Sequence, residues 1–223
     1  MLSTITITTG NGEFKSIELA DATRIELSAN SSLTFPRAYQ FRPVRNVRLS
    51  GEAYFRVSHL ARGESPEYGE AFTVNTDLMD VTVLGTEFNV RERRGVGQVA
   101  LIKGGVVVKA LRSGQRRTLR PGDIVKVSSG SNTVETEQKD AMVPGAWTEG
   151  KFSVNQTSVK DILTAFEDLY GYQVILDQPE LANKKIDGSI SIASEQGLLF
   201  TLSNILDVNV KKKGRVIRLE KRR

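Results

Sequence analysis

The sequence predicts two domains: an all-β domain of short strands, arranged as a coil, solenoid or sandwich, and then a small α/β domain with repeated β-α-β units. Residues 5–134 consist of short, alternating apolar runs between glycine-rich turns, without a helical period before residue 157. Residues 135–144 are polar and precede a glycine, which is typical of a linker. Two apolar stripes with helical spacing follow, each between β-like runs. We therefore predict domains at residues 1–136 and 146–223, with a linker at residues 137–145.

The composition of this 223-residue chain is that of an ordinary soluble protein, with 39% hydrophobic and 26% charged residues. Cysteine is absent and His59 is the single histidine, which excludes disulfides, zinc–thiolate sites and multi-histidine metal sites. The net charge of +5 comes largely from residues 211–223. A solvated tail explains this cluster more simply than nucleic-acid binding, so we expect no nucleic-acid partner. We also expect no cofactor.

The first domain contains a change of strand parity at Gly85. The apolar residues Val81 and Val83 occupy odd positions, whereas Phe88 and Val90 occupy even ones. Because side chains alternate faces along a strand, this change would move the apolar set to the other face unless the backbone bends. A glycine can form that corner, because it tolerates φ > 0, and we expect Gly85 to do so as a bulge or sharp bend.

The same change recurs at residues 104–105, between apolar residues at 99 and 101 and others at 106 and 108. Repeated corners favour a wound stack of strands over flat hairpins.

The second domain begins with a strand at residues 152–154. Ser158 and Asp161 then resemble a capping box, and an apolar stripe predicts a helix that ends at Gly171. Strands are predicted at residues 172–176 and 186–192. Ser194 caps a second helix, and a hairpin of residues 208–210 and 216–219 closes the chain. The predicted buried face of the second helix comprises Leu198, Leu199, Leu202, Ile205 and Leu206.

Five segments resemble, in order, the motifs of the FecR-type sigma regulators of cell-surface signalling. They are residues 19–24 (LADATR), 30–33 (NSSL), 49–55 (LSGEAYF), 83–90 (VLGTEFNV) and 119–123 (LRPGD). The motif residues to which we assign structural roles are Gly51, Glu52, Gly85, Thr86, Phe88, Asn89, Pro121 and Gly122. Ala22 departs from the family, which usually has a turn glycine there. The second domain is similar to the short N-terminal domain of secretins and TonB-dependent transducers.

The resemblance implies the periplasmic part of a single-pass inner-membrane protein. Family members carry a cytoplasmic sigma-binding domain and a membrane helix upstream, and neither pattern occurs in this sequence. The implied partner is the N-terminal signalling domain of an outer-membrane TonB-dependent transducer, and the implied output is control of an extracytoplasmic-function sigma factor. Contact with the sigma factor itself would belong to the missing cytoplasmic region.

The residues supply no catalytic set, so we predict that the chain is not an enzyme. His59 follows a predicted strand, and the sequence places no acid, nucleophile or metal ligand beside it. No nucleotide-binding or hydrolase motif occurs. An alternative function is an envelope module that binds a glycan or another small ligand. It would be favoured if Tyr39, Tyr54, Tyr68 and Trp147 converged on one groove; for Trp147 we expect packing between the domains instead.

For the partner surface, we predict the terminal hairpin. An exposed strand edge can pair with a strand of another protein, and the basic residues there would either discourage unwanted pairing or steer an acidic partner. The predicted partner-binding residues are Val208, Val210, Lys211, Lys212, Lys213, Arg215, Ile217 and Leu219.

Overall fold

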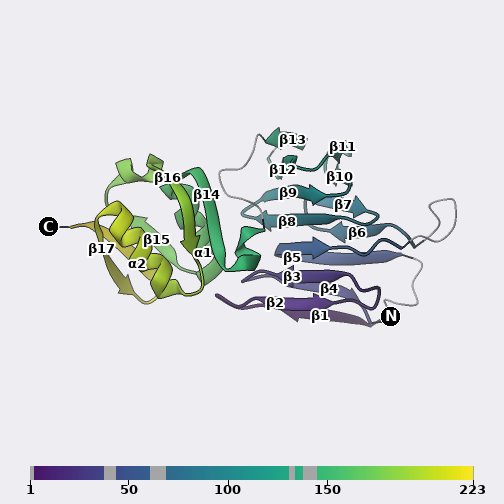
Figure 1. Cartoon of the computed structure of the whole chain (residues 1–223), viewed down its shortest axis with the longest axis horizontal. Coiled ribbons are helices and arrows are strands. Elements are labelled where there is room, and N and C mark those ends of the chain that lie inside the picture. The colour runs from purple at the N-terminus through teal and green to yellow at the C-terminus, as the bar shows by residue number, and fades with distance from the viewer. Residues whose placement is uncertain (1–2, 38–43, 61–68, 131–133, 138–144, 223) are drawn as a thin grey trace. The chain divides into compact units, whose positions relative to one another are not determined.

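The computed structural model describes residues 3–37, 44–60, 69–130, 134–137 and 145–222 (Figure 1). The chain divides into two compact units: a first unit of residues 1–10 and 14–139, and a second unit of residues 11–13 and 140–223. Most of the predicted linker, residues 138–144, lies outside the described residues. None of the helices within the described ranges is long and apolar enough to cross a membrane.

The first unit is all-β within its described residues, as predicted. Its strands are β1 (Thr4–Thr8), β2 (Lys15–Glu18), β3 (Arg24–Leu27), β4 (Ser32–Pro36), β5 (Arg45–Arg56), β6 (Phe72–Asn75), β7 (Met79–Val83), β8 (Glu87–Arg93), β9 (Val96–Lys103), β10 (Val106–Ala110), β11 (Arg116–Leu119), β12 (Ile124–Ser128) and β13 (Val134–Glu137).

These strands form two sheets that share β5. Sheet A contains β1, β4, β6, β7, β10 and β11, and sheet B contains β2, β3, β8, β9, β12 and β13. The first residues of β5 pair with β6 in sheet A, and residues 51–56 pair with β8 in sheet B. After β5 the chain adds two strands to each sheet in turn, so that hairpins alternate between the sheets up the stack (Figure 1).

Gly51 marks the point at which β5 passes from one sheet to the other. Its φ of +101° lies in the region that favours glycine. A Cβ atom there would lie 2.4 Å from Oγ of Ser31, so the close approach also excludes a side chain. The predicted structural role of Gly51 therefore has two physical reasons.

The corner at Gly85 keeps the apolar residues of β7 and β8 in one core. Val81, Val83, Phe88 and Val90 all belong to the same buried cluster, as the parity change predicts. The corner does not use the positive φ that glycine tolerates, because Gly85 is not among the residues with positive φ. A glycine is needed for another reason: a Cβ atom at this position would lie 2.6 Å from Cβ of His59.

The second unit contains two α-helices between short strands. Its elements are η2 (Ala146–Glu149), β14 (Lys151–Ser158), α1 (Val159–Tyr170), β15 (Gln173–Leu176), η3 (Pro179–Asn183), β16 (Lys185–Ser191), α2 (Glu195–Leu206), β17 (Val208–Lys213) and β18 (Val216–Lys221).

The strands on either side of each helix lie in different sheets. β14 pairs antiparallel with β16, whereas β15 and β17 flank β18 in a three-stranded sheet. The order of elements agrees with the prediction, but the repeated β-α-β unit, with parallel strands joined across a helix, is not confirmed. Element order follows from local patterns, whereas strand pairing depends on contacts between distant residues.

Local signals fix the ends of both helices. Ser158 Oγ accepts a hydrogen bond from the Asp161 amide at 3.1 Å, and Gly171 ends α1 with a φ of +68°. Ser194 caps α2 in the same way. One residue of the predicted buried face of α2 is misplaced, because Ile205 is 37% exposed.

Candidate functional site

The C-terminal hairpin, predicted to bind the partner, consists of β17 and β18 and is only partly accessible. Ile217 and Leu219 are fully buried and lie on β18, which pairs with β15 on one side and with β17 on the other. Val208 is also fully buried. Within the described part of the second unit, β17 pairs only with β18. A partner strand can therefore add at β17 but not at β18.

Two lysines of β17 are engaged within the second unit. Lys211 Nζ lies 2.7 Å from Glu220 Oε2, and Lys212 Nζ lies 2.6 Å from Glu195 Oε1. The Lys212 ammonium also lies 4.5 Å from the centroid of the Tyr172 ring. The hydrogen bond to Glu195, with a contribution from Tyr172, raises the pKa of Lys212 above its ordinary value. The contact of Lys212 with Glu195 ties the hairpin to the start of α2, whereas that of Lys211 with Glu220 lies within the hairpin.

The rest of the predicted hairpin site is more open. Lys213 is exposed, and Val210 is half-buried. Arg215 is exposed in the turn, where its Nη1 donates to the Tyr170 carbonyl at 3.3 Å. The positive charge available to a partner at this edge is therefore smaller than the run of basic residues indicates, because Lys211 and Lys212 already have carboxylate partners.

The motif residues of sheet B make interactions that join strands. Asn89 Nδ2 donates to Glu52 Oε1 at 3.0 Å, which links β8 to β5. The Phe88 ring stacks on Phe55 with centroids 5.0 Å apart. Each contact crosses from one strand to its neighbour.

Two further motifs form corners. Thr86 Oγ1 donates to the Gly105 carbonyl at 2.9 Å, which joins two successive corners of the stack. The turn at Pro121 and Gly122 precedes β12; Gly122 has a φ of +93° and donates its N–H to the Leu101 carbonyl.

The turn at Ala22 keeps its conformation without the glycine. Ala22 has a φ of +62°, and its N–H donates to the Leu19 carbonyl at 2.9 Å. The Leu19 N–H in turn donates to the Thr23 carbonyl. This sequence therefore has alanine where the family usually has glycine, and the left-handed conformation places a small strain on the backbone at Ala22.

Arg45 is a central residue that the sequence analysis missed. Its side chain and that of Asp21 are 4% and 9% exposed, and Nη1 lies 3.0 Å from the Asp21 carboxylate. The same guanidinium donates to the carbonyls of Ser58, Glu70 and Leu84. One side chain thus holds four segments of the first unit together.

A signal for Arg45 exists in the sequence. It shares parity with Val47 and Leu49, so the strand pattern places it on the buried face. A buried arginine requires carboxylate or carbonyl partners.

An open groove lies beside the corner at Gly85, with a volume of about 400 Å³. We call it the His59 groove. It is lined by Ala22, Arg24, Arg56, Val57, Ser58, His59, Gly85, Thr86, Glu87 and Lys103. Two of the segments that resemble the FecR motifs, residues 19–24 and 83–90, contribute to it, together with the ends of β5 and β9.

The remaining predictions concern catalysis and aromatic residues. Across the described ranges, no group of three or more His, Asp and Glu side chains could hold a metal ion. Tyr39 and Tyr68 lie outside the described residues, and Tyr54 is buried with its hydroxyl donating to Glu87. Trp147 is buried, and its packing between the domains remains a prediction.

Comparison with protein families gives two matches. Residues 5–107 match the model described as FecR protein, and residues 151–219 match the model described as FecR, C-terminal. Comparison with curated proteins gives no match.

Solved structures give a likeness over nearly the whole chain. Crystal structures at 2.50 and 1.65 Å resolution of a candidate anti-sigma factor from Parabacteroides distasonis ATCC 8503 are 26% identical to this chain, with a TM-score of 0.77. The alignments cover 99% and 98% of this chain and 100% of the other.

Proposed function

This chain belongs to the FecR family and has a role in sigma-factor regulation, and from that premise we propose that it is the periplasmic signalling region of a membrane-anchored regulator. In this proposal it binds the N-terminal signalling domain of an outer-membrane TonB-dependent transducer. Binding alters the activity of an extracytoplasmic-function sigma factor on the other side of the inner membrane. Such coupling requires a difference in affinity between two states and no bond chemistry.

The outer edge of β17 is the observation that supports this proposal best. Within the described part of the second unit, this edge carries no paired strand. A partner strand added there would form main-chain hydrogen bonds along the six residues of β17. Lys213, which lies at the end of the strand and is exposed, would favour approach of an acidic surface.

Proline substitutions can test this edge without unfolding the sheet. Neighbouring residues of a strand direct their N–H groups to opposite edges, so one of Val210→Pro and Lys211→Pro removes a bond to β18 and the other removes a donor at the free edge. The variant with the smaller loss in thermal melting temperature identifies the free-edge donor. We expect that variant to bind the transducer domain at least about tenfold more weakly, as measured by calorimetry.

Thr118→Pro is the matched control, because β11 ends the strand order of the first unit. It should leave the affinity unchanged. If the free-edge variant of β17 binds as tightly as the unmodified protein, partner binding does not use this edge and the proposal is wrong.

A further inference from the structure

A row of charged residues crosses sheet B at one end of its strands. The strand registers place Glu18 opposite Arg24, Arg24 opposite Arg56, Arg56 opposite Glu87, and Glu87 opposite Lys103. All but Glu18 line the His59 groove. The groove therefore has an ordered set of charges along one wall.

Two arginines face each other in this row. Like charges directly opposite on neighbouring strands destabilise a sheet, so Arg24 and Arg56 are an unfavourable pair in the free protein. Their side chains are 69% and 50% exposed. This repulsion occurs at a position where both side chains remain accessible to a ligand.

Each of these arginines is oriented through its Nε alone. Arg24 Nε lies 3.1 Å from Glu18 Oε2, and Arg56 Nε lies 3.0 Å from Glu87 Oε1. Tyr54 supports the second pair, since its hydroxyl donates to the same Glu87 oxygen and its ring lies 5.0 Å from the Arg56 guanidinium carbon. Among the described residues, the terminal nitrogens of both arginines have no hydrogen-bond partner. They form paired donors suited to carboxylates.

The positive charge extends beyond the two arginines. Lys103 stands at the far end of the row, three strand spacings from Arg24, which corresponds to about 14 Å. The groove wall thus carries three permanent cations and one anion, with His59 beside them. A single small anion could contact only part of this length.

We propose that the His59 groove binds an acidic, extended peptide segment of a partner protein. One carboxylate bridges the terminal nitrogens of Arg24 and Arg56 and removes the unfavourable contact between them. A second carboxylate, four residues further along the peptide, reaches Lys103, since side chains four residues apart on one face of an extended chain are about 14 Å apart. This site belongs to the first unit and does not depend on the contact proposed at β17.

The single histidine makes binding directly observable. In the full chain, His59 gives one set of imidazole resonances, and it lies in the groove. Titration with a hexaglutamate peptide should shift these resonances saturably, and hexaglutamine should not. Inorganic phosphate, which shares the negative charge but not the length, should bind at least about tenfold more weakly.

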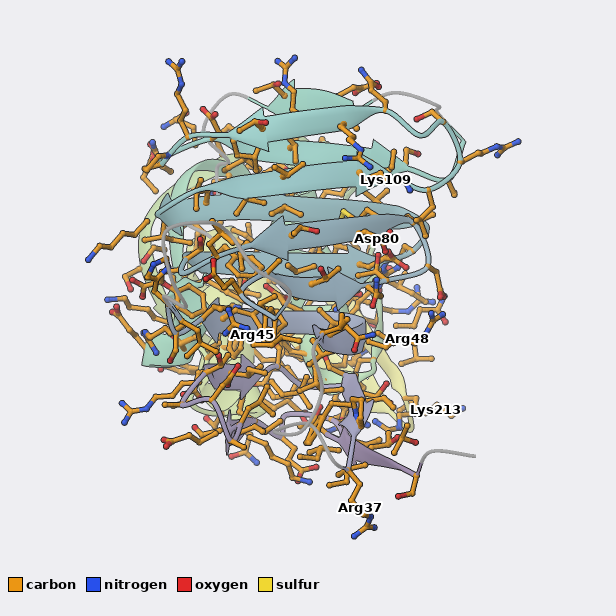
Figure 2. All side chains as sticks on the ribbon, turned by 90° about the vertical axis from the view of Figure 1, so that its right-hand side faces the viewer. Arg37, Arg45, Arg48, Asp80, Lys109 and Lys213 are labelled. Atoms are coloured by element: carbon orange, nitrogen blue, oxygen red, sulfur yellow. The ribbon has the colours of Figure 1, made fainter. Side chains whose placement is uncertain are left out.

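Arg24→Gln and Arg56→Gln test the two donors, and Arg48→Gln is the matched control. Arg48 is equally exposed and forms an ion pair with Asp77, but it lies on sheet A, where Figure 2 shows it in line with Asp80 and Lys109. We expect each groove variant to weaken hexaglutamate binding about tenfold, and the control to leave it unchanged. Neither groove variant should lower the melting temperature of the free protein by more than a few degrees, because each removes an exposed ion pair and a repulsion together.

Three results would overturn the proposal. One is the absence of a saturable shift at His59 with hexaglutamate, and another is equal weakening by Arg48→Gln, which would show general charge attraction. The third is phosphate binding as tight as peptide binding, which would make the groove a site for a small anion. None of these outcomes bears on binding at β17, so failure here is separable from failure of the proposed function.

Discussion

Each of the two units of this protein is stabilised internally by a different kind of interaction. In the first unit, sequence-distant strands share one apolar core, and a buried ion pair, Arg45 with Asp21, joins segments that are far apart in the chain. In the second unit, local caps at Ser158 and Ser194 define both helices. Substitutions that remove single contacts between distant segments should therefore destabilise the first unit most. In the second unit, substitutions at local helix caps should have the larger effect.

The largest effect is expected at Arg45. Arg45→Met leaves the Asp21 carboxylate buried without its cation and three carbonyls without their donor. Removal of one partner from a buried pair costs about 3–5 kcal/mol of unfolding free energy. Urea unfolding followed by β-sheet circular dichroism should show this loss, while the helical signal of α1 and α2, in the second unit, should change little.

Arg48→Met is the control, because Arg48 forms an exposed ion pair and should change stability by less than about 1 kcal/mol. Equal losses in the two variants would contradict the central role of Arg45.

The next effect is expected at the corner between β7 and β8. Gly85→Ala places a Cβ atom 2.6 Å from Cβ of His59, so the two segments must separate, at a cost of about 1–3 kcal/mol. Gly105→Ala is a matched control, since a Cβ atom there meets nothing within 4 Å. Denaturant melts compare the two, and recovery of stability in Gly85→Ala with His59→Gly would confirm the cause. A Gly85 variant as stable as the Gly105 variant would refute it.

A smaller effect, confined to the second unit, is expected for Ser158→Ala. The variant loses the oxygen that accepts from the Asp161 amide, and loss of such a cap costs about 1 kcal/mol. Trp147 fluorescence should detect the shift in the urea midpoint. Ser158→Asp, which can still cap, should retain most of the stability; if both variants lose the same amount, capping is not the cause.

The smallest effect is a gain. Ala22→Gly relieves a left-handed alanine with a φ of +62°, which should stabilise the first unit by up to about 1 kcal/mol after the added freedom of the unfolded chain is deducted. Ala20→Gly, two residues earlier and outside the left-handed region, should lose stability instead. Thermal melting distinguishes the two signs, and a loss in both variants would show that the turn is unstrained.

The same contrast explains how far the sequence could predict the structure. Parity around Gly85 predicted a shared core, because alternation along a strand is local, and helix spacing predicted α1 correctly. The pairing of β14 with β16 was not predicted, since pairing is decided by residues remote in the chain.

The candidate sites show the same limit. The edge at the C-terminal hairpin was predicted, but the central place of β18 was not, so that Ile217 proved to be core. The opposed arginines of the His59 groove lie 32 positions apart, and only the strand register brings them together.

Because successive hairpins join the two sheets alternately, the strands after β5 follow one another along the stack in chain order. After β5, each added hairpin pairs with the strand laid down before it in the same sheet. Amide hydrogens should then exchange in order of position, fastest at the terminal strands β1, β2, β11 and β13 and slowest around β5, whose two halves lie in both sheets. Local opening at β11 and β13 would leave the His59 groove intact, because the charged residues that line it lie on β3, β5, β8 and β9.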